Sequence, residues 1–178
     1  MHKDALGSRF ACLEWERRFL VDRFPADISI TGVRHIIDRY IIGTRLRLRR
    51  TSDSQGTVAF KLTQKLNDTA QAALQGQLTT IYLAEEEYRV LEALPASHLE
   101  KMRYSVPPFG VDVFKGDLAG LILAEAEFNS AEEAAALDLP AFLFKEVSAD
   151  QRFTGGYLSS ASREQVLKNL REFGISPD

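Results

Sequence analysis

Pairs of carboxylates occur at two places in this chain, and a single residue separates the two acids of each pair. Glu14 and Glu16 lie near the N-terminus, whereas Glu125 and Glu127 lie in the second half of the chain. Carboxylate oxygens are the ligands that hard divalent cations such as Mg²⁺ and Mn²⁺ prefer in proteins. The two pairs therefore indicate a site for a divalent metal ion.

Basic side chains follow the same alternating spacing. Arg45, Arg47 and Arg49 alternate with leucines, and Lys101 and Arg103 are also separated by one residue. A guanidinium group matches phosphate oxygens with two parallel hydrogen bonds, and lysine adds a point charge. Acids and bases in one cavity would form a metal-bridged polyphosphate site, because bound metal offsets the repulsion between carboxylates and phosphates.

The charged residues lie in segments where charged and apolar residues alternate, which is the period of a β-strand. In residues 13–21, for example, Trp15 and Phe19 share one face and the acids share the other. We count about eight such strands with short connections, which favours antiparallel pairing. The clearest predicted strands span residues 13–21, 38–50, 58–64, 79–83, 99–106, 110–114 and 120–128.

Capping patterns predict a smaller number of helices. Ser162 and Ser130 each begin a capping-box pattern ahead of a helical segment. Residues 84–94 are predicted to form a third helix, residues 25–30 a short helical turn, and residues 67–77 a mobile loop. The chain is therefore predicted to be one α+β domain, residues 1–178, built on an antiparallel sheet.

Composition narrows the classes of protein to which the chain can belong. It has 178 residues, of which 45% are hydrophobic, and a net charge of −3. One cysteine excludes an internal disulfide and a cysteine-based zinc site. No apolar run approaches the ~20 residues that span a bilayer, and the polar start lacks the apolar segment of a signal peptide. We therefore expect a cytoplasmic protein with no membrane partner.

Nucleic acid is also not an expected partner. The basic run at residues 45–50 lacks interleaved aromatic residues, and the domain as a whole is acidic. The expected partner is instead a small molecule, and a homodimer is left open.

The charged strand faces allow two readings. Antiparallel sheets often have one solvated, charged face. In this chain, however, acids neighbour acids and bases neighbour bases, whereas a solvated face would sooner mix the two signs. The alternative is a barrel whose apolar residues point outward beneath helices, while its charged residues surround a watery lumen.

An ordered set of charged motifs extends along nearly the whole chain. It comprises EWERR (14–18), RLRLRR (45–50), FKLTQK (60–65), KMRY (101–104), VDVFKG (111–116), LAEAEF (123–128) and KEVSADQRF (145–153). The first looks like the ExExK signature of the CYTH domain, or triphosphate tunnel metalloenzyme, family, and the set as a whole resembles that family. The resemblance implies an eight-stranded antiparallel barrel that binds triphosphates with divalent metal. Known activities of the family are inorganic triphosphatase, thiamine triphosphatase and class IV adenylate cyclase.

The resemblance also implies roles for individual residues. The implied metal ligands are Glu14, Glu16, Glu125, Glu127, Asp112 and Glu146. The implied substrate-binding residues are Arg45, Arg47, Arg49, Lys61, Lys101, Arg103 and Arg152. Arg18 stands in the place of the signature lysine and is assigned a catalytic role with Glu125 and Glu127.

Two departures from the family pattern bear on the chemistry. Arg18 keeps the positive charge of the signature lysine but cannot easily lose a proton. Thr79, Thr80 and Ile81 stand where many members have an Arg-x-Glu strand, so one wall of the tunnel is predicted to be less charged. This weakens the transfer of a nucleotide-cyclase role.

The leading hypothesis is a metal-dependent hydrolase of small triphosphates that uses Mg²⁺ or Mn²⁺. One metal ion, on Glu14 and Glu16, would bridge phosphate oxygens, and a second, on the Glu125 side, would position the attacking water. Tripolyphosphate is favoured because no aromatic residue is identified as a stacking platform, since Trp15 points outward. The alternatives are a class IV-type adenylate cyclase, a thiamine triphosphatase and a non-catalytic polyphosphate- or nucleotide-binding module.

Overall fold

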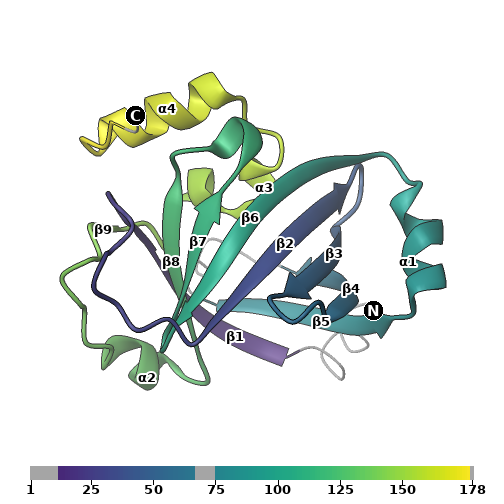
Figure 1. Cartoon of the computed structure of the whole chain (residues 1–178), viewed down its shortest axis with the longest axis horizontal. Coiled ribbons are helices and arrows are strands. Elements are labelled where there is room, and N and C mark those ends of the chain that lie inside the picture. Colours follow the sequence, from purple (N-terminus) through teal and green to yellow (C-terminus); the bar gives the residue numbers. More distant parts are fainter. Residues whose placement is uncertain (1–11, 67–74, 177–178) are drawn as a thin grey trace, which may run out of the picture.

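The computed structural model describes residues 12–66 and 75–176. Over these residues the strands form one antiparallel sheet in the order β5-β4-β3-β2-β6-β7-β8-β1-β9, and β1 also pairs with β5 (Figure 1). The strands are β1 (Cys12–Leu20), β2 (Gly32–Ile41), β3 (Leu46–Asp53), β4 (Val58–Leu66), β5 (Gln75–Leu83), β6 (Ala96–Val106), β7 (Phe109–Phe114), β8 (Ile122–Phe128) and β9 (Lys145–Glu146). The helices are α1 (Glu85–Glu92), α2 (Ala131–Ala135), α3 (Gly155–Leu158) and α4 (Arg163–Glu172). The predicted antiparallel α+β architecture is confirmed.

The predicted single strand over residues 38–50 is wrong. This segment contains the end of β2, a turn and the start of β3. Gly43 adopts a φ of 76° in the turn, a left-handed conformation that side chains other than glycine rarely take. The alternation of charged and apolar residues is broken over residues 39–44 (RYIIGT) and is regular only from Arg45 onward, so Gly43 and this break were the sequence signal of the turn.

Other elements also differ from the predictions. Residues 25–30 form bends and turns without a helix, and β5 begins at Gln75, inside the predicted loop. The rest of that loop, residues 67–74, lies outside the described residues. The two-residue strand β9 and the short helix α3 were not predicted. The capping box at the start of α4 is confirmed, with Ser162 and Gln165 exchanging hydrogen bonds. At the start of α2 the hydroxyl of Ser130 accepts from the backbone of Glu133, but the Glu133 carboxylate accepts from the backbone of Asn129, so the box is incomplete there.

Strand register places the predicted charged residues on one face of the sheet. Arg18 lies opposite Glu125, and Arg103 lies opposite Asp112. Arg49 lies between Asp38 on β2 and Lys61 on β4. Because side chains alternate across a strand, the residues between these point to the other face.

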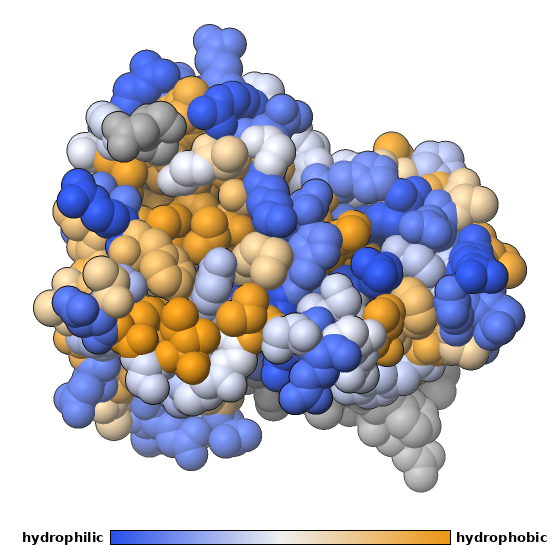
Figure 2. All heavy atoms as spheres, viewed as in Figure 1, coloured by the Kyte–Doolittle hydropathy of each residue, from blue (hydrophilic) through white to orange (hydrophobic). Residues whose placement is uncertain are grey.

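That other face is apolar and covered, as predicted. Phe19, Val111 and Ala124 belong to a buried cluster on β1, β7 and β8. On the β3–β5 part of the sheet, Tyr88 of α1 packs on Phe60 of β4, with ring centroids 4.5 Å apart. The helix α1 is otherwise mostly charged, and Figure 2 shows hydrophilic side chains around it, whereas apolar ones gather over the half of the molecule that holds β7 and β8.

At one end of the strands, the charged face gives way to an apolar one. Leu20, Leu99, Phe114 and Leu123 share the face of the charged residues but form one buried cluster with Leu158 of α3 and Val166 and Leu170 of α4. The C-terminal helices therefore close this end, whereas the sequence predicted helices only on the outside. The contact is close, because a Cβ atom on Gly155 would lie 2.0 Å from the hydroxyl of Tyr40.

The described helices are all too short or too polar to cross a membrane.

Candidate active site

A network of acids and bases crosses β1, β8, β7 and β6 on the charged face. The guanidinium of Arg18 donates to Glu16 at 2.7 Å and to Glu125 at 3.0 Å. Arg103 donates to both carboxylate oxygens of Asp112 at 2.6 Å and also to Glu125. Glu125 thus lies between two guanidinium groups, and each is fixed by a second carboxylate.

Asp112 anchors the deepest part of this network. Its side chain is 0% exposed, and it accepts hydrogen bonds from the ammonium of Lys101 as well as from Arg103. Both of its carboxylate oxygens are therefore occupied by cations of β6. Its position indicates that it orients Lys101 and Arg103.

A second acid–base cluster lies on β2 and β3. The carboxylate of Asp38 is 1% exposed and accepts two hydrogen bonds from Arg49, at 2.6 and 2.7 Å. The Nε atom of Arg47 lies 3.8 Å from the same carboxylate, is buried, and has no hydrogen-bond partner in the described part of the chain. Asp38 was not predicted as a site residue, because its pairing with Arg49 depends on the hairpin turn that the sequence prediction missed.

The third wall, on β4 and β5, carries less charge, as the sequence predicted. Thr63 and Thr80 form a hydroxyl–hydroxyl hydrogen bond at 3.0 Å. Lys61 is the cation of this wall among the residues whose side chains are described, and its ammonium lies 4.8 Å from the centre of the Tyr82 ring. Tyr82 lies on the same face, opposite Lys61, and was not predicted as a site residue.

The ion pairs hold the buried groups in their charged forms. Burial opposes ionisation of Glu125, but Lys101, Arg103 and Arg18 outweigh it and hold the pKa of this carboxyl well below its usual range. Burial likewise opposes the charge of Asp38, and Arg49 and other nearby cations lower its pKa. The site is thus an array of fixed charges near neutral pH.

Several predicted site residues lie at the rim of this network or away from it. Arg45 is exposed in the bend before β3, and Glu127 is exposed on β8. Glu146 does not join the other carboxylates, because it lies on the opposite face of β1, where Arg17 donates to it at 2.7 and 3.0 Å. Only the backbone of Glu14 is described, opposite Gly76.

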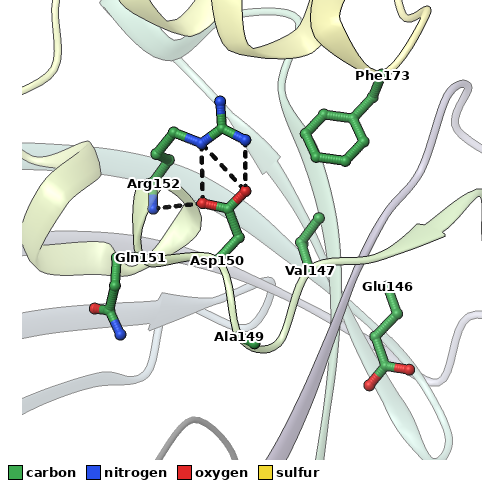
Figure 3. Close-up of a pocket in the computed structure, with 7 residues that line it drawn as sticks. All are labelled: Glu146, Val147, Ala149, Asp150, Gln151, Arg152 and Phe173. Atoms are coloured by element: carbon green, nitrogen blue, oxygen red, sulfur yellow. Dashed lines mark hydrogen bonds and ion pairs between the residues drawn. The ribbon is translucent and has the colours of Figure 1, made fainter. Parts of the chain in front are cut away.

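Arg152 also lies apart from the network, in a surface hollow (Figure 3). It donates to Asp150 at 2.7 Å and to Glu172 of α4. The contact with Asp150 stays within the turn, whereas the contact with Glu172 joins the turn to the C-terminal helix. Arg152 therefore forms its ion pairs with Asp150 and Glu172, away from the charged sheet face that holds Arg47 and Arg103.

The carboxylates of β1 and β8 suit a hard divalent cation in chemistry and in position. Glu16 and Glu127 are directly opposed in the strand register, and like charges so placed repel unless a cation lies between them. In the structure, the positive charge between Glu16 and Glu125 is the guanidinium of Arg18, which forms an ion pair with each of them. Among the described residues no three acids, histidines or cysteines are grouped closely enough to form a metal site.

Comparison with known proteins supports the predicted family. No family model matches the chain. A protein named inorganic triphosphatase, from Nitrosomonas europaea, is 33% identical over 148 residues, which cover 79% of this chain and 92% of that protein. The chain belongs to the CYTH, or triphosphate tunnel metalloenzyme, family.

Solved structures support the assignment of this chain to the CYTH family. A crystal structure of an inorganic triphosphatase matches with a TM-score of 0.54 and 28% identity, covering 83% of this chain and 95% of that one. A second crystal structure, of a protein called hypothetical, matches with a TM-score of 0.55 and 28% identity, covering 84% and 99% of the two chains. The predicted family and its sheet are therefore confirmed.

Proposed function

We propose that this protein hydrolyses small triphosphates with the help of a divalent metal ion, and that inorganic tripolyphosphate is its preferred substrate. The observation that carries the proposal is the gathering of carboxylates and basic side chains on one sheet face. Carboxylates of β1 and β8 share this face with basic side chains of β3, β4 and β6, and Arg103 of β6 pairs directly with Glu125 of β8. The relative named inorganic triphosphatase supports the same activity.

The charged face would line a tunnel. Strand β1 pairs with β8 on one side and with β5 on the other, so strands β1–β8 each have two neighbours. An eight-stranded barrel would follow, with β9 as a short addition beside β1. Because α3 and α4 cover one end, substrate would enter from the other end.

Phosphate would be held by the cations that the structure brings to this face. Arg47 is the leading candidate, because its buried Nε atom has no hydrogen-bond partner within the described residues. Arg103 and Lys61 would contribute from the neighbouring walls. Asp38 and Asp112 would orient these cations, rather than bind metal.

The carboxylates Glu14, Glu16, Glu125 and Glu127 would hold Mg²⁺ or Mn²⁺. A metal ion held by these carboxylates would supply Lewis-acid chemistry, offsetting the negative charge of the phosphates and lowering the pKa of a water molecule. Without substrate, Arg18 pairs with Glu16 and Glu125, and Arg103 also pairs with Glu125. The charged face can therefore fold before it meets its ligands. A single domain and a cytoplasmic location remain predictions from composition.

The direct test measures the products formed from tripolyphosphate, ATP and thiamine triphosphate with Mg²⁺ or Mn²⁺. Release of phosphate from tripolyphosphate, abolished by EDTA and recovered on adding metal, is the expected result. Pyrophosphate and cyclic AMP from ATP would indicate a cyclase. Binding of tripolyphosphate without turnover would indicate a binding module and would contradict the proposed hydrolase.

A further inference from the structure

The side chain of Arg103 crosses strand β7 and contacts acids on two different strands. Arg103 lies on β6, opposite Asp112 of β7, and its guanidinium also donates to Glu125 of β8. Strand β7 lies between β6 and β8, and neighbouring strands are ~4.8 Å apart. The guanidinium therefore reaches Glu125 by passing over the backbone of β7.

The residue at the crossing point is Gly110. It lies directly opposite Glu125 in the register of β7 and β8, and it shares the charged face with Asp112, two residues further along β7. A Cβ atom on Gly110 would lie 3.1 Å from both Cδ and Nε of Arg103 and 3.3 Å from its Cζ. These separations are shorter than the ~3.5–4.0 Å at which carbon atoms pack best. A side chain at this position would therefore collide with Arg103.

Arg103 cannot move aside without losing a partner. It donates two hydrogen bonds to Asp112, both at 2.6 Å, and the side chain of Asp112 is 0% exposed. Lys101 donates to the same carboxylate, which is therefore held from two sides. Any displacement of the Arg103 guanidinium breaks a charge-assisted hydrogen bond to Asp112 or to Glu125.

The backbone at Gly110 does not itself require glycine. The residue lies within β7, and its φ is outside the left-handed region that favours glycine. Glycine also weakens the interior of a strand, because it has no side chain to pack and loses more conformational freedom on folding. The reason for glycine that the structure provides is the space that Arg103 occupies.

We propose that Gly110 is a positioning residue for the triphosphate site, because its missing side chain leaves the path along which Arg103 spans from Asp112 to Glu125. This inference rests on the proposed function, in which Arg103 contacts phosphate. Gly110 itself would touch neither phosphate nor metal and would act only through Arg103. Its replacement should therefore weaken phosphate binding only while Arg103 is present.

The experiment measures tripolyphosphate binding with Mg²⁺ by calorimetry. The variants are Gly110→Ala, Gly32→Ala, Arg103→Ala, and Gly110→Ala combined with Arg103→Ala. Gly32 is the matched control, because it flanks Ser105 on one side of β6 as Gly110 does on the other, and the nearest contact of a Cβ atom there would be Ser105 Oγ at 3.7 Å. Both alanines restrict the unfolded chain to a similar extent, so their comparison isolates the contact with Arg103.

We expect Gly110→Ala to weaken tripolyphosphate binding about tenfold, as loss of one charge-assisted contact requires. On the Arg103→Ala background, the same replacement should change the affinity less than about twofold, because the side chain that it displaces is gone. Gly32→Ala should bind as the wild type does.

A second readout tests the placement of Arg103 without any ligand. In NMR spectra of the ligand-free protein, the Nε–H signal of Arg103 is assigned by its absence in Arg103→Ala. This signal should shift in Gly110→Ala and stay in place in Gly32→Ala.

Several results would overturn the positioning role. Wild-type affinity in Gly110→Ala would refute it while leaving the triphosphatase function intact. Equal losses with and without Arg103 would mean that the variant acts on the fold rather than through Arg103. Should Gly110→Ala fail to fold, recovery of the far-UV circular dichroism spectrum in the double variant would support the collision with Arg103, and continued unfolding would refute it. Failure of the wild type to bind tripolyphosphate would refute the proposed function and, with it, this extension.

Discussion

Replacement of Asp38 by asparagine tests how the phosphate-binding wall is held together. The variant keeps the shape of the side chain but removes the negative charge that Arg49 contacts at 2.6 and 2.7 Å. Removing one partner of a buried ion pair costs about 3–5 kcal/mol, because the other charge remains buried without compensation. The side chain of Arg49 is 15% exposed, so water can relieve part of this cost. We expect Asp38→Asn to lower the free energy of unfolding by about 2–4 kcal/mol.

Tripolyphosphate should recover much of this loss, because its phosphate oxygens can replace the missing carboxylate at Arg49. The assay is urea denaturation of the wild type and the variant, with and without tripolyphosphate and Mg²⁺. The ligand should raise the free energy of unfolding more in Asp38→Asn than in the wild type. Asp22→Asn is the control, because Asp22 is exposed, and we expect a change within about 0.5 kcal/mol.

Either of two results would refute this reasoning. A variant as stable as the wild type would show that the pair between Asp38 and Arg49 does not compensate a buried charge. An equal gain from tripolyphosphate in both proteins would show that Arg49 does not face the ligand.

Three further predictions follow from the same structure. Glu16→Gln should abolish most metal-dependent phosphate release while leaving the circular dichroism spectrum unchanged, because an amide is a poorer ligand for a hard cation; full activity in the variant or in EDTA would contradict this. Leu48→Ala should cost about 2–5 kcal/mol in urea denaturation, because Leu48 is fully buried on the outer face; a loss below about 1 kcal/mol would argue against that packing. The folded-state pKa of Asp38 is lowered, so its contribution to stability is present above the usual carboxyl pKa of ~3.9 and is lost as pH falls below it; the difference in unfolding free energy between wild type and Asp38→Asn should therefore shrink in acid, and a constant difference would be inconsistent with an ionised Asp38.

The alternation of residue types was sufficient to predict which residues share a face. Spacing placed Lys101 with Arg103 and Glu125 with Glu127, the family resemblance added Arg18, and the strand register brings Arg18, Arg103 and Glu125 together. This succeeded because side-chain direction in a strand depends only on parity. Parity does not, however, give the position along the strand. Leu20 and Leu123 have the parity of the charged residues but lie under the C-terminal helices.

Pairings between distant segments could not be predicted from parity either. Glu146 lies within the family-like motif KEVSADQRF (145–153), but strand β9 places it on the outer face, where it pairs with Arg17. Asp38 was overlooked because the turn between β2 and β3, which brings it opposite Arg49, was not recognised. Tyr82 was overlooked because the end of β5 had not been located relative to Lys61. In each case the missing information was a long-range register, which depends on tertiary packing rather than local pattern.

The most direct test of the central claim is the tripolyphosphate affinity of two arginine variants of strand β3. Arg47 lies on the charged face, whereas Arg50 lies on the opposite face, across from Phe60. If the charged face binds the phosphate chain, Arg47→Ala should weaken tripolyphosphate binding by about tenfold or more, measured by calorimetry with Mg²⁺, whereas Arg50→Ala should leave it unchanged. Wild-type affinity in Arg47→Ala, or an equal loss in both variants, would contradict the claim that phosphate binds on this face.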